Sequence, residues 1–363
     1  MTAEAYVAGP SPPGRASGAV IISPDPANRA GGVERMCSLL QGVLEQDGWR
    51  VNVVGPGRVP ARWVSRLGAG YLAGSISATR GAMALHPRLL ITNGFLGCGR
   101  SRHCTRIHVY HGTMVGNTRA EGNSLPRHDR VRRTVGAGLA EAVAGRGAAV
   151  VSVSQKASEE VRRYYGVRSD AVIPNGVDTN TFRPRSREQA RQALGLAGDG
   201  RYALYVGRLQ RLKGTELLVH ASREAGYELL IAGESGDSAA TRNLGVLDPD
   251  RLACAYAAAD CVLFPSRYEA CSYVVLEALS CGVPLITTRV GWMPTFLQGV
   301  PQYERLCVEP EHDEIVARLR ALPTLDTASL TSAAREWIVA HNSLQSYATQ
   351  WRELLADLNV SAQ

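Results

Sequence analysis

The sequence predicts an α/β protein of two domains, each built around a parallel β-sheet. The chain has 363 residues, more than the ~150 of an average domain. Short apolar runs alternate with longer amphipathic segments along it, which is typical of strands and helices in alternation. A polar stretch, Pro174–Arg187, divides these runs into two series. Hydrophobic residues make up 45% and charged residues 20% of the chain, as in an ordinary globular protein.

Continuous apolar runs bounded by turns predict buried parallel strands. In the first series the expected strands are Ala19–Ser23, Arg50–Val54, Leu89–Thr92, Arg106–Tyr110 and Ala148–Val153, with helices at Gly32–Asp47 and Ser154–Tyr165. In the second they are Tyr202–Val206, Glu228–Ala232, Cys261–Phe264 and Pro284–Thr287, with helices at Glu216–Glu224, Asp250–Ala259 and Ser272–Ser280. The carboxyl ends of two such sheets enclose a cleft, where we expect the ligand.

The same pattern predicts the domain boundaries. Residues 1–18, rich in Pro, Gly and Ala, are expected to be a flexible leader. Residues 19–180 form the first domain and residues 181–342 the second. The rest, 343–363, contains one amphipathic helix that we expect to pack back on the first domain.

Charge and composition narrow the function classes. The chain has 40 Lys and Arg against 33 Asp and Glu, a net charge of +7. Its arginine clusters, Arg100–Arg106 and Arg127–Arg133, lack interleaved aromatic residues, so no nucleic-acid partner is expected. An anionic small molecule or a membrane surface accounts for such clusters equally well. No apolar run approaches the ~20 residues of a membrane span and no signal peptide begins the chain, so we expect a cytoplasmic protein.

The eight cysteines give no metal or redox signal. None forms a C-x-x-C pair, and no paired histidine spacing accompanies them. Neither a zinc site nor a redox dithiol is therefore indicated. We expect neither a metal nor another cofactor.

Two loops have residues suited to phosphate. Gly31 and Gly32 precede the first expected helix, where free N–H groups and the helix dipole favour an anion. The loop Gly207–Gly214 follows the first strand of the second domain. Its Arg208 and Lys213 offer a planar fork and a point charge, a combination suited to a diphosphate. A plain tight turn and a solvated charged loop are the alternative interpretations.

The strongest signal is a pair of glutamates in the segment Pro265–Leu279. Glu269 follows a buried strand and is expected to face the cleft. Glu277 lies about two turns into the next helix, where it can accept from two adjacent hydroxyls of a ribose. A glutamate in an apolar helix is costly to bury without a partner. The alternative is a helix start with one exposed glutamate.

Together these motifs resemble those of the family 4 retaining glycosyltransferases, which have the GT-B architecture of two Rossmann-like domains facing across a cleft. The resemblance rests on the glutamate pair spaced E-x7-E and on four further segments, in the family's order: Gly31–Glu34, Val109–Thr113, Ile173–Asp178 and Gly207–Gly214. These motifs span nearly all of the expected folded chain.

The resemblance implies transfer of a sugar from a nucleotide diphosphate donor, with retention of configuration and without a metal. Arg208 and Lys213 would neutralise the leaving diphosphate. Glu269 would hold the hexose hydroxyls and Glu277 the ribose. His111 would line the reaction centre; a histidine simply satisfied at a strand end is the alternative.

Further donor contacts are implied for the backbone of Gly31 and Gly32 in the first domain. In the second domain they are implied for Gly233, Ser272, Tyr273 and Val274. The family usually has glycine where Ser272 stands; if that backbone requires a positive φ, serine is strained there. The glycine-rich turn Gly233–Asp237 is also short for the family.

The acceptor is the least determined part. We expect a UDP-sugar donor and a small hydroxylated acceptor, for example an aminocyclitol in antibiotic biosynthesis. The segment Arg58–Arg88 mixes Trp63, Leu67 and Tyr71 with arginines, as in the membrane-touching helix of an enzyme with a lipid or polysaccharide acceptor. An ordinary helix is favoured because the segment is rich in Gly and Ser.

A protein of another class, a nucleotide-sugar sensor without catalysis, is the remaining alternative. Such a binder need not keep His111 together with the Arg208 and Lys213 pair. The sequence has no signal for the oligomeric state.

Overall fold

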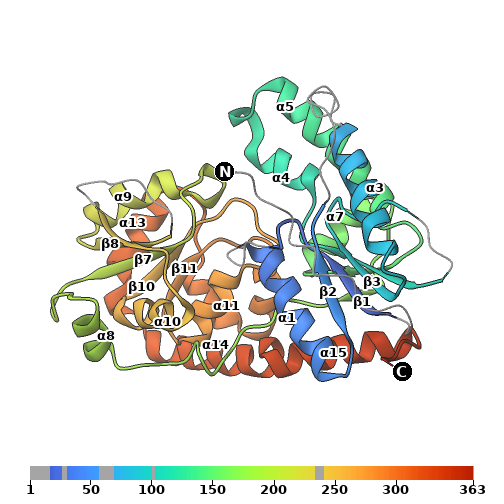
Figure 1. Ribbon diagram of the computed structural model, residues 1–363. Helices are drawn as coiled ribbons and strands as arrows, with labels where there is room; N and C mark the ends of the chain where they lie inside the picture. The colour runs from blue at the N-terminus through green and yellow to red at the C-terminus, as the bar shows by residue number, and fades with distance from the viewer. Residues whose placement is uncertain (1–16, 27–30, 57–68, 100–102, 234–240, 363) are drawn as a thin grey trace, which may run out of the picture.

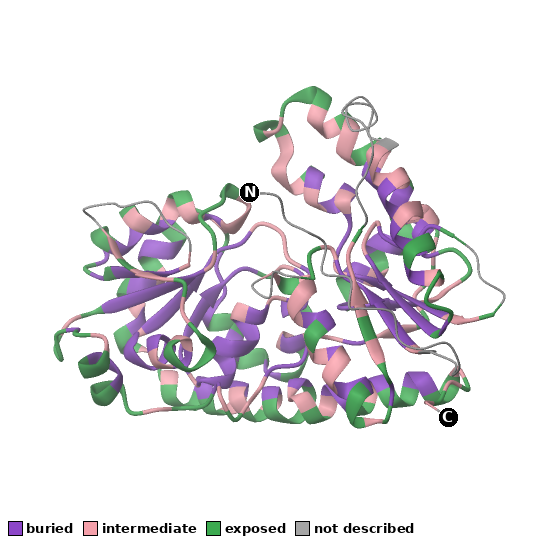
Figure 2. Cartoon of the chain, in the orientation of Figure 1, coloured by how far each residue is buried: buried purple, intermediate pink, exposed green. Residues whose placement is uncertain are grey.

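The computed structural model describes residues 17–26, 31–56, 69–99, 103–233 and 241–362. Within these residues, two parallel sheets stand side by side with helices packed on their faces (Figure 1). The central strands of both sheets are buried, whereas most of the outer strands are partly exposed (Figure 2). The predicted two-domain α/β architecture is therefore confirmed. The expected leader, 1–18, lies almost entirely outside the described residues.

The first domain contains a sheet in the order β2-β1-β3-β4-β5-β6, with every described pair parallel. The strands are β1 (Ser17–Ile22), β2 (Val51–Val54), β3 (Pro87–Asn93), β4 (Thr105–Tyr110), β5 (Ala149–Ser152) and β6 (Ala171–Val172). The order reverses between β1 and β3, and in open α/β sheets the ligand binds at such a switch point. His111 directly follows β4, at the same carboxyl edge.

The helices of this domain are α1 (Gly32–Gln46), α3 (Ala69–Met83), α4 (Met114–Glu121), α5 (Arg127–Val131), α6 (Gly138–Ala144) and α7 (Gln155–Tyr165), with the short helices η1 (Gly122–Ser124) and η2 (Arg132–Ala137). In α3 the ring of Tyr71 lies 5.2 Å from that of Phe95. The described half of Arg58–Arg88 thus packs on its own domain, whereas Trp63 and Leu67 lie outside the described residues.

The second domain contains a parallel sheet in the order β11-β10-β7-β8-β9. Its strands are β7 (Tyr202–Val206), β8 (Glu228–Ala232), β9 (Thr241–Gly245), β10 (Cys261–Phe264) and β11 (Leu285–Thr287). Its helices are α8 (Arg187–Ala193), α9 (Thr215–Glu224), α10 (Pro249–Ala258), α11 (Tyr273–Ser280), α12 (Met293–Gly299), α13 (His312–Ala321) and α14 (Thr327–Asn342), with the short helices η3 (Arg211–Lys213), η4 (Pro301–Leu306) and η5 (Leu322–Thr324).

The last helix, α15 (Leu344–Asp357), continues from α14 and runs beneath α1 of the first domain (Figure 1). The Nε atom of Arg352 lies 2.9 Å from the Oδ2 atom of Asp47, at the end of α1. Trp351 is buried in the same core as residues of α1. The C-terminal helix therefore packs against the first domain in this structure.

Within the described residues, the chain passes between the domains at two places that lie against each other. The backbone N–H of Val177 donates to the carbonyl of Asn342 at 2.8 Å. The side-chain amide of Asn342 donates to the carbonyl of Asn175 at 3.1 Å. Val177 and Ser343 also form a parallel bridge. The two connections are thus hydrogen-bonded to each other.

None of the described helices has the length and apolar character needed to cross a membrane.

Candidate active site

Two of the predicted catalytic residues meet at the carboxyl edge of the second sheet. Lys213, in η3 after β7, donates to the Oε1 atom of Glu269 in the loop after β10. The hydroxyl of Ser266 donates to the same oxygen at 2.8 Å. The side chain of Glu269 is 13% exposed, and that of Lys213 31%. A cation and a hydroxyl thus fix the carboxylate, while both charged groups stay partly accessible to solvent.

The sequence assigned no role to Ser266, although its signal was present. It is the second residue of the Pro-Ser pair that directly follows β10, which places its hydroxyl at the sheet edge beside Glu269. A positioning role for this serine emerges only from the structure.

Arg208 is exposed in the loop after β7. Its carbonyl accepts from the hydroxyl of Tyr205 at 2.7 Å, which fixes the backbone of the loop. Among the described residues, no hydrogen bond or ion pair engages its guanidinium, so the fork is available to an anion. Its role toward a diphosphate remains a prediction.

His111 follows β4 in the first domain, in the loop whose Thr113 contacts Tyr268 beside Glu269. Its Nε2 atom lies 2.9 Å from the Oδ1 atom of Asn93, and the Nδ2 group of Asn93 donates to the carbonyl of Ile22 at 2.9 Å. Because Oδ1 can only accept, Nε2 carries the proton and Nδ1 is left as an acceptor. Burial lowers the pKa of His111 to about 4, so the imidazole is neutral near pH 7.

Glu277 differs most from the expectation. Its residue is 1% exposed, and both carboxylate oxygens have protein partners. Oε1 accepts from Arg35 of α1, in the other domain, and Oε2 accepts from the hydroxyl of Tyr256 at 2.9 Å. Burial raises the pKa of Glu277, against the opposing effect of Arg35. A ribose hydroxyl that binds Oε1 would therefore compete with this guanidinium.

Arg35 contacts two side chains of α11, Glu277 and Tyr273. Its guanidinium lies 4.4 Å from the centre of the Tyr273 ring, at the start of α11, in a cation–π contact. Gly31 and Gly32 begin the helix that contains Arg35: Gly31 is the N-cap and Gly32 the first helical residue of α1. The free N–H groups at this end are thus close in sequence to the cross-domain ion pair.

The backbone before α11 is not strained. Ser272 has φ −80° and ψ 128°, an extended conformation open to any residue. The positive φ that would have disfavoured serine does not occur, so that concern was wrong. Ser272, Tyr273 and Val274 form the amino-terminal end of α11, as the sequence pattern indicates.

Gly233 directly follows β8 with φ +147°, and a side chain there would collide with the carbonyl of Gly207. This close approach brings together the loops after β7 and β8. Of the expected turn Gly233–Asp237, only Gly233 lies within the described residues.

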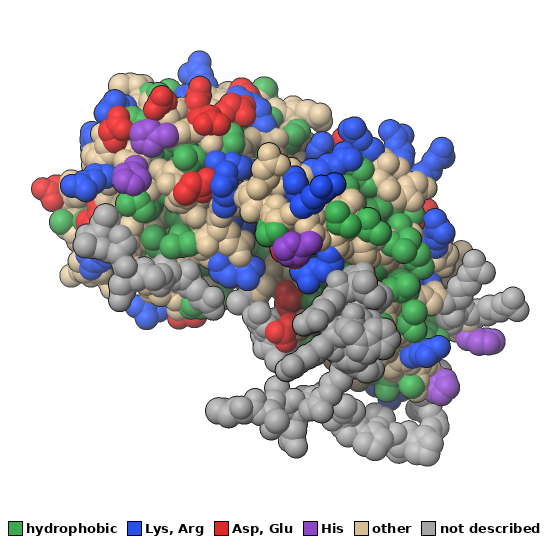
Figure 3. Space-filling model, turned by 90° about the horizontal axis from the view of Figure 1, so that it is seen from above, with side chains coloured by type: hydrophobic (Ala, Val, Ile, Leu, Met, Phe, Trp, Pro, Cys, Tyr) green, Lys and Arg blue, Asp and Glu red, His purple; other side chains and the backbone are tan. Residues whose placement is uncertain are grey.

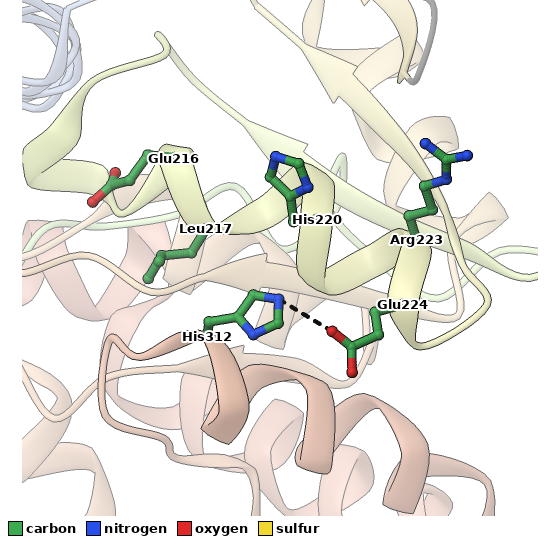
Figure 4. A pocket seen from close by; sticks show the side chains of 6 residues that line it. All are labelled: Glu216, Leu217, His220, Arg223, Glu224 and His312. Carbon is green, nitrogen blue, oxygen red and sulfur yellow. Dashed lines mark ion pairs between the residues drawn. The ribbon is translucent and has the colours of Figure 1, made fainter.

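The face that contains these loops is hollowed between the two lobes, with acidic side chains at the hollow (Figure 3). A different pocket, of ≈ 730 Å³, lies between α9 and α13 (Figure 4). In this pocket the Nε2 atom of His312 lies 3.5 Å from the Oε2 atom of Glu224. None of the predicted site residues lines this pocket. Among the described residues, no three His, Cys, Asp or Glu side chains are arranged to hold a metal.

The fold and the sheet-edge site define a glycosyltransferase of the GT-B architecture. Two family models match the chain: Glycosyltransferase Family 4 over residues 30–181 and Glycosyl transferases group 1 over residues 186–337. The chain therefore belongs to the family 4 glycosyltransferases.

Relatives with sequence similarity are named D-inositol 3-phosphate glycosyltransferase. The protein of Segniliparus rotundus is 34% identical over 214 residues, which are 52% of this chain and 46% of that protein. The protein of Acidothermus cellulolyticus is 35% identical over 219 residues, 52% of this chain and 48% of that protein. The chain thus spans about half the length of these relatives.

Solved structures share the fold. Sucrose-phosphate synthase of Thermosynechococcus elongatus aligns with a TM-score of 0.77 and 22% identity, over 95% of this chain and 99% of that chain. Anabaena HepE in complex with UDP-glucose aligns with a TM-score of 0.68 and 18% identity, over 93% and 99%. At such identities the likeness concerns the fold.

Proposed function

We propose that this protein is a retaining, metal-independent hexosyltransferase that moves a hexose or amino-hexose from a UDP-sugar to a hydroxyl of a small cyclitol. The observation that carries the proposal is the Lys213–Glu269 pair, fixed by Ser266 at the sheet edge and facing the domain that contains His111. The names of the relatives support an acceptor of the inositol phosphate kind. The UDP-glucose complex of HepE supports a uridine donor.

In this reaction the bond between the sugar's anomeric carbon and the diphosphate breaks, and the acceptor oxygen bonds to that carbon on the same face. The ammonium group of Lys213 has three N–H donors, so it can keep its hydrogen bond to Glu269 and also donate to the departing diphosphate. Placing that charge where negative charge develops is usually the largest catalytic contribution. The acceptor proton passes to the departing phosphate oxygen, so no separate general base is required.

Glu269 and His111 then orient the transferred sugar from opposite sides. The carboxylate of Glu269 accepts from hexose hydroxyls. The neutral imidazole of His111, protonated on Nε2, presents Nδ1 as an acceptor for another hydroxyl. Positioning of this kind accounts for several kcal/mol of many catalysed barriers.

The test is a panel of UDP-, GDP- and ADP-sugars, each with D-inositol 3-phosphate, with myo-inositol or with no acceptor. We expect UDP release that depends on the cyclitol, a product with the mass of the cyclitol glycoside, and an anomeric coupling that matches the donor. The control is the Glu269→Gln variant, which should still bind UDP. UDP-sugar binding without release from any mixture would indicate a sensor, and release unaffected by cyclitols would refute the acceptor.

A further inference from the structure

A tyrosine of the second domain reaches across the cleft into the first. The hydroxyl of Tyr268 accepts from the backbone N–H of Thr113 at 2.8 Å. It also lies 2.8 Å from the Oε2 atom of Glu160, to which it donates. The hydroxyl of Thr113 donates to the same Glu160 oxygen at 2.8 Å. One carboxylate of α7 thus joins a loop of each domain.

These two loops are the ones that present the predicted catalytic groups. Tyr268 directly precedes Glu269, and Thr113 lies two residues after His111. We propose that Tyr268 is a positioning residue, which holds Glu269 and His111 at their working separation through its contact with Glu160 and Thr113. This inference rests on the proposed transfer reaction and adds to it a residue that touches neither substrate.

The residue between His111 and Thr113 is adapted to this contact. Gly112 has φ +100°, a conformation that side chains rarely adopt, and a Cβ atom there would lie 2.9 Å from the Tyr268 hydroxyl. The loop of the first domain therefore leaves room for the tyrosine of the second. The loop after β4 and the loop after β10 thus have complementary residues, Gly112 and Tyr268, where the two domains meet.

A contact of this kind can control the rate without controlling donor affinity. Domains that share a modest interface move relative to each other by default. A hydrogen bond to a carboxylate that forms only in the closed arrangement shifts such an equilibrium by about tenfold. The Lys213 and Arg208 side chains predicted to bind the diphosphate both follow β7 in the second domain, and the Tyr268 hydroxyl contacts neither of them.

The experiment compares Tyr268→Phe, which removes only the hydroxyl, with Tyr164→Phe. Tyr164 is a matched control because it belongs to α7, the helix that contains Glu160, and its hydroxyl accepts from Arg119 on an exposed surface. We expect Tyr268→Phe to lower kcat about tenfold, to change the Kd for UDP less than twofold and to enlarge the radius of gyration in small-angle scattering. Tyr164→Phe should change none of these.

A second pair of variants links the effect to Glu160. Glu160→Gln should also lower kcat, and its combination with Tyr268→Phe should lower kcat no further than the stronger single variant. Unchanged turnover in Tyr268→Phe, or a loss of UDP affinity as large as the loss of turnover, would overturn the positioning role. If the wild type transfers no sugar, the proposed function fails, while scattering still decides whether Tyr268 holds the domains together.

Discussion

Lys213 and Glu269 form an ion pair at the edge of the second sheet. We predict that Lys213→Ala lowers kcat by about 10²–10³-fold, because it removes the charge placed at the leaving diphosphate. Arg208→Ala should lower kcat similarly but leave the thermal unfolding temperature unchanged, since no described residue engages its guanidinium. Steady-state kinetics and thermal unfolding of both variants provide the measurement. Near-wild-type turnover in both would exclude this loop from the mechanism.

Because the buried His111 is neutral, the free energy of unfolding should depend on pH. Burial holds its pKa near 4 in the folded state, below the ordinary ~6.5. A depressed folded-state pKa adds stability that is present above pH 6.5 and is lost as the pH falls toward 4. We predict that His111→Gln reduces the loss of unfolding free energy between pH 6.5 and 5 by about 1–2 kcal/mol.

Urea unfolding at the two pH values measures this difference. His108, whose pKa burial lowers to about 3, contributes in the same direction but is present in both proteins. An equal pH dependence of wild type and variant would show that His111 is not the neutral group described here.

At the scale of elements, an ion pair joins α1 and α11 through Arg35 and Glu277, and we predict that it opposes donor binding. We predict that Arg35→Met binds UDP about tenfold more tightly, because the ribose no longer competes with a guanidinium for Glu277. The same variant should unfold more easily by about 3 kcal/mol, since a buried carboxylate loses its partner. Calorimetric titration and urea unfolding measure the two effects.

Two glutamate variants serve as controls for this prediction. Glu277→Ala should weaken UDP binding by about 10- to 100-fold, whereas Glu269→Ala should leave it nearly unchanged and lower turnover. Weaker UDP binding by Arg35→Met would mean that Arg35 itself contacts the nucleotide.

The sequence predicts the elements whose pattern is local. The expected bounds of β7, β8 and β10 coincide with the observed ones because each is a continuous apolar run. The sequence analysis missed β9 and β6. Strand β9 is polar and lacks the apolar pattern of a strand, and β6 has only two residues. Both strands are stabilised by hydrogen bonds to neighbouring strands. Such pairing cannot be inferred from the residues of a short segment alone.

The same distinction holds for the site. Lys213 and Glu269 are found from motifs because each follows a buried strand at a sheet edge. The Arg35–Glu277 pair joins residues 242 positions apart, and the Tyr268–Glu160 contact joins residues 108 apart. Contacts at such separations depend on how the domains approach, which no periodicity in the sequence encodes.

At the scale of the whole molecule, the two cationic side chains predicted to meet the donor diphosphate, Arg208 and Lys213, both belong to the second domain. We predict that activity persists in excess EDTA, because Lys213 and Arg208 supply the positive charge that a divalent ion supplies in other transferases. The assay is UDP release with EDTA, compared with EDTA followed by excess magnesium. Loss of activity that magnesium restores would contradict the prediction.

The two connections between the domains, joined through Val177 and Asn342, have a mechanical consequence. A single tether would let one lobe swing and twist in every direction about the other. Two connections that are hydrogen-bonded to each other resist twisting of one domain against the other. Rotation about the line through the two connections is then the motion that costs least free energy. The domains therefore open by hinge rotation about one axis. Closing them costs only the conformational entropy of that single rotation. Each closure brings the same loops together.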